Sequence, residues 1–279
     1  MGRKGDKAMR IRSFVINFAA AMLLTGSAWA AGEAKPPKDV PFSFEGPFGT
    51  FDRAAAQRGL QVYREVCAAC HSLKYIAFRD LERLGYSEAE AKAIAREYQI
   101  TDGPDEMGEM FQRPGKLSDR FPPPFPNEQA ARAANGGALP PDLSLIVEAR
   151  KGGADYVYSV LTGYGEAPAG ESLRPGQYWN DYFPGHKIAM PPPLMDGMVT
   201  FADGTKATVD QMAHDVTTFL AWAAEPNMEE RKEWGWRVLI YLFFLTVLFY
   251  LAYRKIWAPV KAGYSPLAET KADDDGASS

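Results

Sequence analysis

The sequence has few cysteines and histidines, and this shortage excludes several kinds of protein. Its 279 residues include only two cysteines and three histidines. A small domain held by disulfides needs several cysteine pairs that close long loops, whereas Cys67 and Cys70 stand three positions apart. A zinc finger needs four ligands at regular spacings, which His186 and His214 do not provide. The two thiols therefore serve a local purpose, and something other than disulfides holds the fold together.

An excess of positive charge is missing as well. The formal net charge is −4, and five basic residues against Asp6 give the first thirty residues a balance of +4. The rest of the chain therefore carries −8. Such an acidic chain is unsuited to binding nucleic acid and favours a basic partner.

The N-terminus has the pattern of a secretory signal peptide. Residues 3–12 are basic, Ser13–Gly32 carries no charge, and Ala28 and Ala30 are small residues at the positions that a signal peptidase recognises. We expect a signal peptide over residues 1–30 and export of the domain that follows. The alternative is an uncleaved N-terminal anchor, which would also export that domain.

A second hydrophobic segment predicts a transmembrane helix over residues 234–256. The uncharged run Val238–Tyr253 lies between Arg237 and Arg254. The alternative is a buried core helix, but the segment is apolar on all sides. Positive charges are equal at its two ends, so the signal peptide decides the orientation: residues 31–233 in the periplasm and the tail 257–279 in the cytoplasm. Aromatic residues suited to the two membrane interfaces are Trp234, Trp236, Tyr253 and Trp257.

Between these segments, capping residues predict short helices joined by Gly- and Pro-rich loops. The fold class is mostly α, because proline runs at 122–126 and 191–193 exclude helix interiors and central strands. The segment 199–207, with Asp203-Gly204 at its centre, predicts the only hairpin. The predicted helices run from Asp52 to about Ala69, from the box Ser87–Glu90 to about Tyr98, from Asn127 to Gly136-Gly137, over Asp155–Leu161 up to Gly163, and from the box Thr208–Gln211 to about Ala224.

The residues Cys67-Ala68-Ala69-Cys70-His71 form the pattern Cys-x-x-Cys-His, which is typical of covalent haem attachment. Two thiols on one helix face can add to the two vinyl groups of one haem edge, and His71 can then give its imidazole to the iron. Export favours this interpretation, because attachment takes place outside the cytoplasm. A thioredoxin-like pair needs a βαβ setting and zinc needs four ligands, so both alternatives are weaker.

The iron needs a sixth ligand, and the residues alone leave several candidates open. Met190 stands directly before Pro191–Pro193, whose rigid backbone can hold a weak thioether, and Met–His ligation raises the reduction potential. Met212 and His214 fall in a predicted helix, where core or surface roles are commoner. The other candidates are Met107, Met110, His186, Met195, Met198 and Met228.

Six motifs along the chain carry a resemblance to a known family. They are His71–Lys74, Arg113–Asp119, Asn135–Ser144, Leu161–Tyr164, Ile188–Pro193 and Trp222–Pro226. In this order they resemble the cytochrome c1 family, the haem subunits of the ubiquinol–cytochrome c reductase (cytochrome bc1) complex, from about Phe42 to the C-terminal anchor. The resemblance implies a cytochrome c-like haem domain with one transmembrane helix. Some bacterial members carry an extra cysteine pair, which this chain lacks.

The resemblance implies roles for individual residues. Met190 would be the sixth iron ligand beside His71, and Arg150 would pair with a haem propionate. A backbone carbonyl of Pro140 or Pro141 is expected to accept the other ring N–H of His71 and so raise its basicity. Further matches to haem-pocket positions are Tyr156, Asn135, Pro140 and Pro141.

The resemblance also implies a function. The protein would take one electron from a Rieske iron–sulfur protein and pass it to a soluble, basic cytochrome c, beside cytochrome b in a dimeric complex of an electron-transport chain. It would lie in a bacterial inner membrane, with one covalent haem c on the periplasmic side, and would not be an enzyme alone. The alternatives are a c-type cytochrome of a terminal oxidase, a tethered carrier, or an anchored thiol-redox or metal-binding protein.

An acidic stretch, 102–109, contains no basic residue. Its acids are Asp102, Asp105, Glu106 and Glu109, with Met107 and Met110 among them. We expect it to help dock the basic cytochrome c, and a solvated loop is the simpler alternative.

Overall fold

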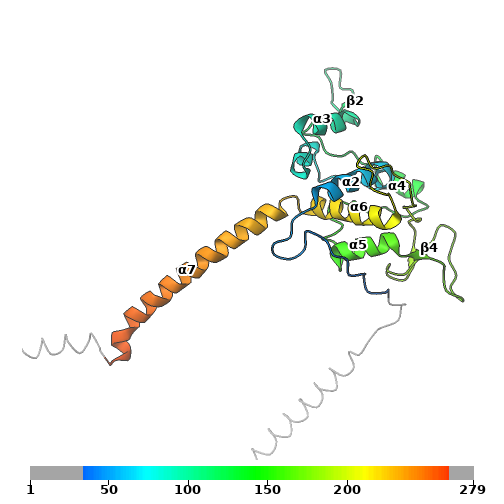
Figure 1. Cartoon of the computed structure of the whole chain (residues 1–279). Helices are drawn as coiled ribbons and strands as arrows, with labels where there is room; N and C mark the ends of the chain where they lie inside the picture. The colour runs from blue at the N-terminus through cyan, green and yellow to red at the C-terminus, as the bar shows by residue number, and fades with distance from the viewer. Residues whose placement is uncertain (1–33, 264–279) are drawn as a thin grey trace, which may run out of the picture.

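The computed structural model, which describes residues 34–263, consists of a cluster of short helices and one long helix that extends away from it (Figure 1). The long helix is α7 (Met228–Lys261). The predicted signal peptide over residues 1–30 and most of the predicted tail, from residue 264 onward, lie outside the described residues. The boundaries 31–233 and 257–279 stay predictions.

The core of the cluster is the crossing of α2 (Arg53–Glu65) and α6 (Val209–Ala224). Gly59 makes the close approach possible, because a Cβ at this position would meet the backbone carbonyl of Asp215 and the side chain of Phe219. Tyr63, Phe219 and Trp222 then pack as a buried aromatic group. Burial of these large rings contributes to the hydrophobic stabilisation of the crossing.

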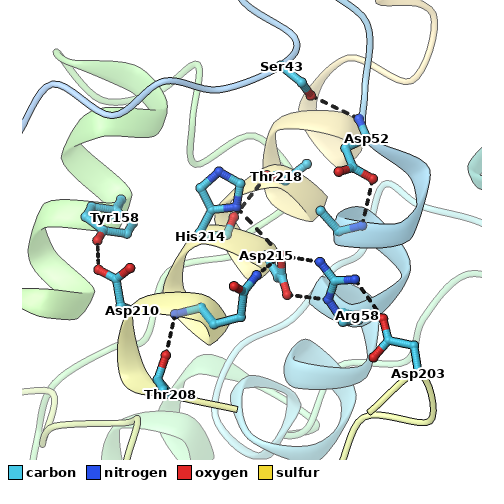
Figure 2. A network of polar contacts seen from close by, with 12 residues as sticks. Ser43, Asp52, Arg58, Tyr158, Asp203, Thr208, Asp210, His214, Asp215 and Thr218 are labelled. Carbon is cyan, nitrogen blue, oxygen red and sulfur yellow. Dashed lines mark hydrogen bonds and ion pairs between the residues drawn. The ribbon is translucent and has the colours of Figure 1, made fainter. Parts of the chain in front are cut away.

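A polar network also joins α2 and α6 at this crossing (Figure 2). The guanidinium of Arg58 donates to both carboxylate oxygens of Asp215, which is fully buried, at 2.7 and 3.1 Å. It also reaches Asp203, at 2.8 Å, in the loop before α6. The two carboxylates raise the pKa of Arg58, with Asp215 the larger cause. Arg58 therefore fixes both the helix crossing and the loop that leads into α6.

The predicted helices are present, and their capping residues act as expected. Asp52, Ser87, Asn127 and Thr208 each accept a hydrogen bond from the backbone N–H three residues on. The remaining helices are the 3-10 helices η1 (Cys67–Ala69) and η2 (Phe78–Leu84), and the α-helices α3 (Glu88–Arg96), α4 (Glu128–Ala134) and α5 (Gly153–Thr162).

The strands are short and do not lie where the hairpin was predicted. Residues 199–207 form turns without strands, so that prediction was wrong. Gly204 takes φ +77° in a turn as expected, but Val199 and Phe201 are buried in the core instead of pairing across a ladder. Two antiparallel sheets are observed. In the first, β1 (Gln99–Asp102) pairs with β2 (Phe111–Pro114). In the second, the central strand β4 (Tyr178–Asn180) pairs with β3 (Tyr164–Gly165) on one side and β5 (Lys187–Ile188) on the other.

The helix α7 contains the predicted membrane span and extends beyond it on both sides. None of its most apolar window is buried by the described part of the chain, and its hydropathy and length suit a membrane crossing. A buried core helix is therefore wrong for this segment. Glu225, Pro226 and Asn227 separate α7 from α6, as expected from the sequence.

Candidate functional site

The Cys-x-x-Cys-His motif lies directly after α2, in the tight turn η1. The α-helix ends at Glu65, so the prediction that it continues to Ala69 was wrong for its last turn. The carbonyl of Cys67 accepts the backbone N–H of both Cys70, at 3.1 Å, and His71, at 2.9 Å. Residues i and i+3 eclipse each other in a 3-10 helix. Cys67 therefore opens this turn and Cys70 closes it, which keeps the two cysteines one tight turn apart.

The two thiols are free, and their environment is unlike that of a redox-active pair. Cys67 is half-buried and Cys70 is exposed. Burial raises the pKa of the Cys67 thiol to about 12, and the neighbouring Cys70 adds to this. A redox-active pair works through a thiolate of lowered pKa, which is the opposite environment. Within residues 34–263, all strand pairs are antiparallel, so a βαβ setting is not found there either.

The side chain of His71 is oriented by one of its two ring nitrogens. Its Nδ1 lies 2.7 Å from the backbone carbonyl oxygen of Pro141, the contact that was expected from either Pro140 or Pro141. The Tyr63 hydroxyl, from α2, donates to the backbone carbonyl of His71 at 3.2 Å. Burial lowers the pKa of His71, although Pro141 and Asp142 act in the opposite direction. The imidazole is therefore neutral near pH 7, with Nδ1–H donated to Pro141 and the lone pair of Nε2 left free for a ligand bond.

The segment that carries Pro141 is itself tied to the residues after His71. The backbone N–H of Leu143 donates to the carbonyl of Ser72 at 2.9 Å. The carboxylate of Asp142 accepts the Ser72 hydroxyl at 2.7 Å and the backbone N–H groups of Lys74 and Ser144 at 3.1 and 2.9 Å. These bonds fix the position of the Pro141 carbonyl, and with it the plane of the imidazole.

Met190 lies in a half-buried position directly after β5. The hydroxyl of Tyr164, at the start of β3, donates to the backbone carbonyl of Met190 at 3.2 Å. The strand β4 joins β3 to β5, so Tyr164 and Met190 belong to one small sheet and its exit. Pro191–Pro193 then limit the backbone on the other side. The thioether of Met190 therefore starts from a restrained backbone.

The other candidates for a sixth ligand have different environments. Met212 and Met228 are buried in the core, whereas Met195 and Met198 are exposed on the loop after Met190. His186 stacks on Trp179 with ring centres 4.7 Å apart, and its Nδ1 faces the carbonyl of Asn180 at 3.1 Å. His214 stacks on Phe42 at 5.0 Å and faces Asp215. Met107 and Met110 are exposed near the β1–β2 turn.

The residues expected around the haem propionates and pocket are found in three places. Arg150 is exposed, and among the described residues its guanidinium donates only to the neighbouring carbonyl of Ala149, so it is available to a carboxylate ligand. Burial raises the pKa of Tyr156, and the positive charge of Arg150 partly offsets this rise. Asn135 ends α4 and uses its amide to bond the carbonyl of Ala131 at 2.7 Å. Pro140 is half-buried, beside Pro141.

This donor set fits a covalently attached haem. Two free thiols one turn apart, a neutral imidazole with an oriented Nδ1–H, and a thioether on a restrained loop are the groups that such a haem uses. No cluster of three His, Cys, Asp or Glu side chains is found within residues 34–263 that would hold a separate metal ion.

Sequence reasoning missed three supporting residues, Tyr63, Asp142 and Tyr164. Asp142 had a signal, because Asp-x-Ser after two prolines is typical of a turn in which the aspartate caps the backbone two residues on. Tyr63 and Tyr164 had none, since each bonds to a backbone carbonyl that only the folded chain brings near.

The acidic stretch forms the turn between β1 and β2 (Figure 1). Arg113 on β2 pairs with Asp102 and, at 2.6 Å, with Asp119. Asp105 accepts the backbone N–H groups of Met107 and Glu109 at 2.8 and 2.9 Å and so shapes the turn. Two of the four acids therefore have structural contacts, and Glu106 and Glu109 remain as exposed charges.

Comparisons with known proteins point to one family. A family model described as the cytochrome C1 family matches residues 42–260. A cytochrome b/c1 of Bradyrhizobium diazoefficiens is 50% identical over 91% of this chain, which spans only 41% of that relative's length. A mitochondrial cytochrome c1 heme protein of Saccharomyces cerevisiae is 56% identical over 79% of this chain and 72% of its own length. A cytochrome c1 of Rhodospirillum rubrum is 48% identical over 79% and 87%, respectively.

Proposed function

The chain belongs to the cytochrome c1 family, and from this we propose that it is the haem subunit of a cytochrome b–c1 complex, a quinol–cytochrome c oxidoreductase. Like the family, it binds one covalent haem c. It accepts one electron at a time from a Rieske iron–sulfur protein and donates it to a soluble cytochrome c. It breaks no substrate bond itself, so it is a subunit of an enzyme and not an enzyme alone.

The observation that carries this proposal is the position of His71, directly after the two cysteines and hydrogen-bonded through one ring nitrogen. Its Nδ1 is committed to the carbonyl of Pro141, which leaves Nε2 for iron, and the two thiols lie in the turn directly before it. A hydrogen bond to the second ring nitrogen fixes the tautomer and raises the basicity of the ligand nitrogen. The bound haem supplies a one-electron Fe(III)/Fe(II) couple.

We assign the sixth ligand position to Met190. The bond from Tyr164 and the three following prolines restrain the backbone that carries its thioether. A thioether is a weak ligand, and ligation by Met and His raises the reduction potential relative to two imidazoles. This suits a carrier that accepts electrons from an iron–sulfur centre.

The remaining pocket residues bind the edges of the haem in this proposal. Arg150 pairs with a propionate through its free guanidinium, and Tyr156 lies under the influence of that same charge. Pro141 would orient His71 from a segment that the bonds of Asp142 hold in place, and Asn135 and Pro140 would line the same pocket.

The protein is anchored in a membrane through α7. We place the haem domain, residues 31–233, on the periplasmic side of a bacterial inner membrane and the tail, 257–279, in the cytoplasm, because of the signal-peptide pattern at 1–30. Cytochrome b is the neighbour within the membrane, and the complex is dimeric. The acceptor is a basic cytochrome c that docks near Glu106 and Glu109, beside the exposed Met107 and Met110.

Purification through a tag on the C-terminal tail tests the proposal. We expect cytochrome b and a Rieske protein to co-purify, together with a c-type haem band that survives denaturation in pyridine. Reduction of that haem by quinol should stop when the Rieske protein is removed. A chain without covalent haem would refute the cofactor, and co-purification with a terminal oxidase would replace the complex by the alternative assignment.

A further inference from the structure

A loop of the haem domain, residues 43–50, is fastened to the first turns of α7. The Nζ of Lys232 donates to the backbone carbonyls of Phe44, at 2.7 Å, and Gly49, at 2.9 Å. Just beyond the loop, Glu229 accepts the backbone N–H of Phe51 at 2.7 Å and pairs with Arg53 at 2.6 Å. In Figure 1 this loop is the blue segment beside the beginning of α7. Its position relative to α7 is therefore set by four polar contacts.

The loop has its own closed backbone structure. The N–H of Thr50 donates to the carbonyl of Ser43 at 3.0 Å and closes the base. Gly46 takes φ +69°, a conformation that other residues rarely adopt. Gly49 has no room for a Cβ, which would clash with the backbone of Phe44 and Glu45. The tip, residues 46–48, is thus preformed and carries no charge.

Phe48 at the tip stacks on Trp236 of α7, with ring centres 5.1 Å apart and planes within 4°. Even so, 76% of Phe48 is exposed, and Trp234 and Trp236 remain 55% and 40% exposed. Three large rings therefore share one level of α7, and the described part of the chain leaves all three partly uncovered. Trp234 and Trp236 are two residues apart and so lie on nearly opposite sides of the helix, which leaves the stacked pair of Phe48 and Trp236 as the apolar surface beside the loop. An exposed apolar surface of this kind marks a place that another apolar medium covers.

The position of Trp236 along α7 identifies that medium. The uncharged run begins two residues later, at Val238, and Trp257 lies at the far end of the helix. At about 1.5 Å per residue, Trp236 and Trp257 are about 32 Å apart, close to the ~30 Å thickness of a bilayer's hydrocarbon core. Both tryptophans therefore fall at the membrane interfaces, where aromatic rings are favoured. Phe48, stacked on Trp236, lies at the same depth.

We propose that the loop 43–50 is a second membrane contact, in which Phe48 enters the boundary between lipid headgroups and acyl chains of the leaflet that faces the haem domain. With α7 alone, the chain would enter the membrane at one point. Two contacts limit the tilt of the haem domain over the membrane surface. This inference rests on the membrane crossing of α7 and is independent of which proteins exchange electrons with the haem.

Photo-crosslinking of the whole complex in its native membrane tests the contact. Phe48 is replaced by p-benzoyl-phenylalanine, illuminated, and the modified peptide is analysed by mass spectrometry. We expect a phospholipid adduct. The same replacement at Phe243 or Phe249, both 64% exposed on α7, is the positive control, and Phe111 on β2 should give no lipid adduct.

An adduct that joins position 48 to another protein subunit overturns the proposal. So does the absence of a lipid adduct at position 48 when position 243 or 249 gives one. If no position on α7 labels lipid, the premise that α7 crosses the bilayer fails, and the proposal fails with it.

The effect on tilt has its own measurement. In oriented membranes, Phe48→Asp should broaden the distribution of haem-plane angles seen by electron paramagnetic resonance, with unchanged haem content, whereas Phe111→Asp should leave it unchanged. An unchanged distribution for Phe48→Asp would show that the loop does not restrain the domain.

Discussion

The two sides of the proposed haem site are held in different ways. His71 and the residues after it are bonded to α2 through Tyr63 and to the segment 141–144 through Pro141, Asp142 and Leu143. Within residues 34–263, Met190 is joined to the rest of the fold by the single hydrogen bond from Tyr164. The His71 side is held by a network of hydrogen bonds, and the Met190 side is a short loop held by one.

This difference follows the chemistry that each side supports. The imidazole is a strong ligand that must be present and correctly oriented when the haem is attached, so its orientation is over-determined. The thioether is a weak ligand that other ligands can displace from iron. The hydrogen bond from Tyr164 only restrains the backbone that carries it. Damage to the His71 side should therefore affect haem content and folding, whereas damage to the Met190 side should affect potential and ligand exchange.

The largest effect should come from His71→Ala. Without the imidazole, iron is no longer held beside the two thiols, and we expect most of the covalently bound haem to be lost, as measured by the pyridine haemochrome of purified membranes. Met190→Ala is the matched variant on the other side and should keep its haem. Equal haem content in the two variants would contradict the difference between the sides.

Met190→Leu should leave haem content intact and lower the reduction potential. The expected shift is a substantial part of the roughly 0.8 V range that axial ligands cover, because a stabiliser of Fe(II) is lost. Redox titration of the c-type band measures it. Met195→Leu and Met198→Leu are the controls, since both side chains are exposed. A shift in either of these, and none in Met190→Leu, would move the assignment.

Asp142→Ala should destabilise the His71 side without changing a ligand. It leaves the Ser72 hydroxyl and the backbone N–H of Lys74 without their acceptor, and such a loss costs about 1–3 kcal/mol. Thermal unfolding followed at the haem band should show this. Asp39→Ala removes an exposed carboxylate elsewhere and should have no comparable effect. A stable Asp142 variant with a normal haem spectrum would mean that Pro141 is positioned by other contacts.

Tyr164→Phe should weaken the Met190 side only. A hydrogen bond of this kind contributes about 1 kcal/mol, so an external ligand such as imidazole, which must displace Met190, should bind the oxidised haem about fivefold more tightly. Tyr178→Phe on the adjacent strand β4 is the control, because no hydrogen bond of its hydroxyl is found among the described residues. Unchanged imidazole affinity in Tyr164→Phe would remove the tyrosine from the ligand loop's support.

Charge reversal at the β1–β2 turn should change neither side. Glu106→Lys with Glu109→Lys should slow electron transfer to a basic cytochrome c several-fold at low salt and have little effect at high salt. Potential and imidazole affinity should stay as in the unaltered protein. Asp105 is left in place because it shapes the turn. An unchanged rate at low salt would show that docking takes place elsewhere.

Local signals in the sequence were sufficient for much of this structure. Asp52, Ser87 and Thr208 marked helix starts because a capping side chain acts within three residues of its own position. The hairpin predicted for residues 199–207 was wrong for the opposite reason. Asp203-Gly204 does make a turn, but Phe201 and Val199 are drawn into the core and Asp203 to Arg58 of a distant helix, so tertiary packing prevailed over the local pattern.

The site shows the same division. Cys67, Cys70 and His71 are recognisable because their spacing is local, and the contact between His71 and the Pro140–Pro141 pair was expected from a family resemblance. Tyr63 and Tyr164 could not be predicted, since a tyrosine that bonds to a backbone carbonyl carries no pattern of its own. The β1–β2 pair was missed because its strands are only four residues long.

The acceptor for His71 has one further consequence. It is a main-chain oxygen, which any amino acid at position 141 would provide, so no exchange of side-chain chemistry there can delete it. What a substitution can change is its direction, because proline fixes the local φ angle. In a saturation-mutagenesis experiment, position 141 should therefore sort its variants by backbone stiffness and not by polarity, with glycine among the worst tolerated.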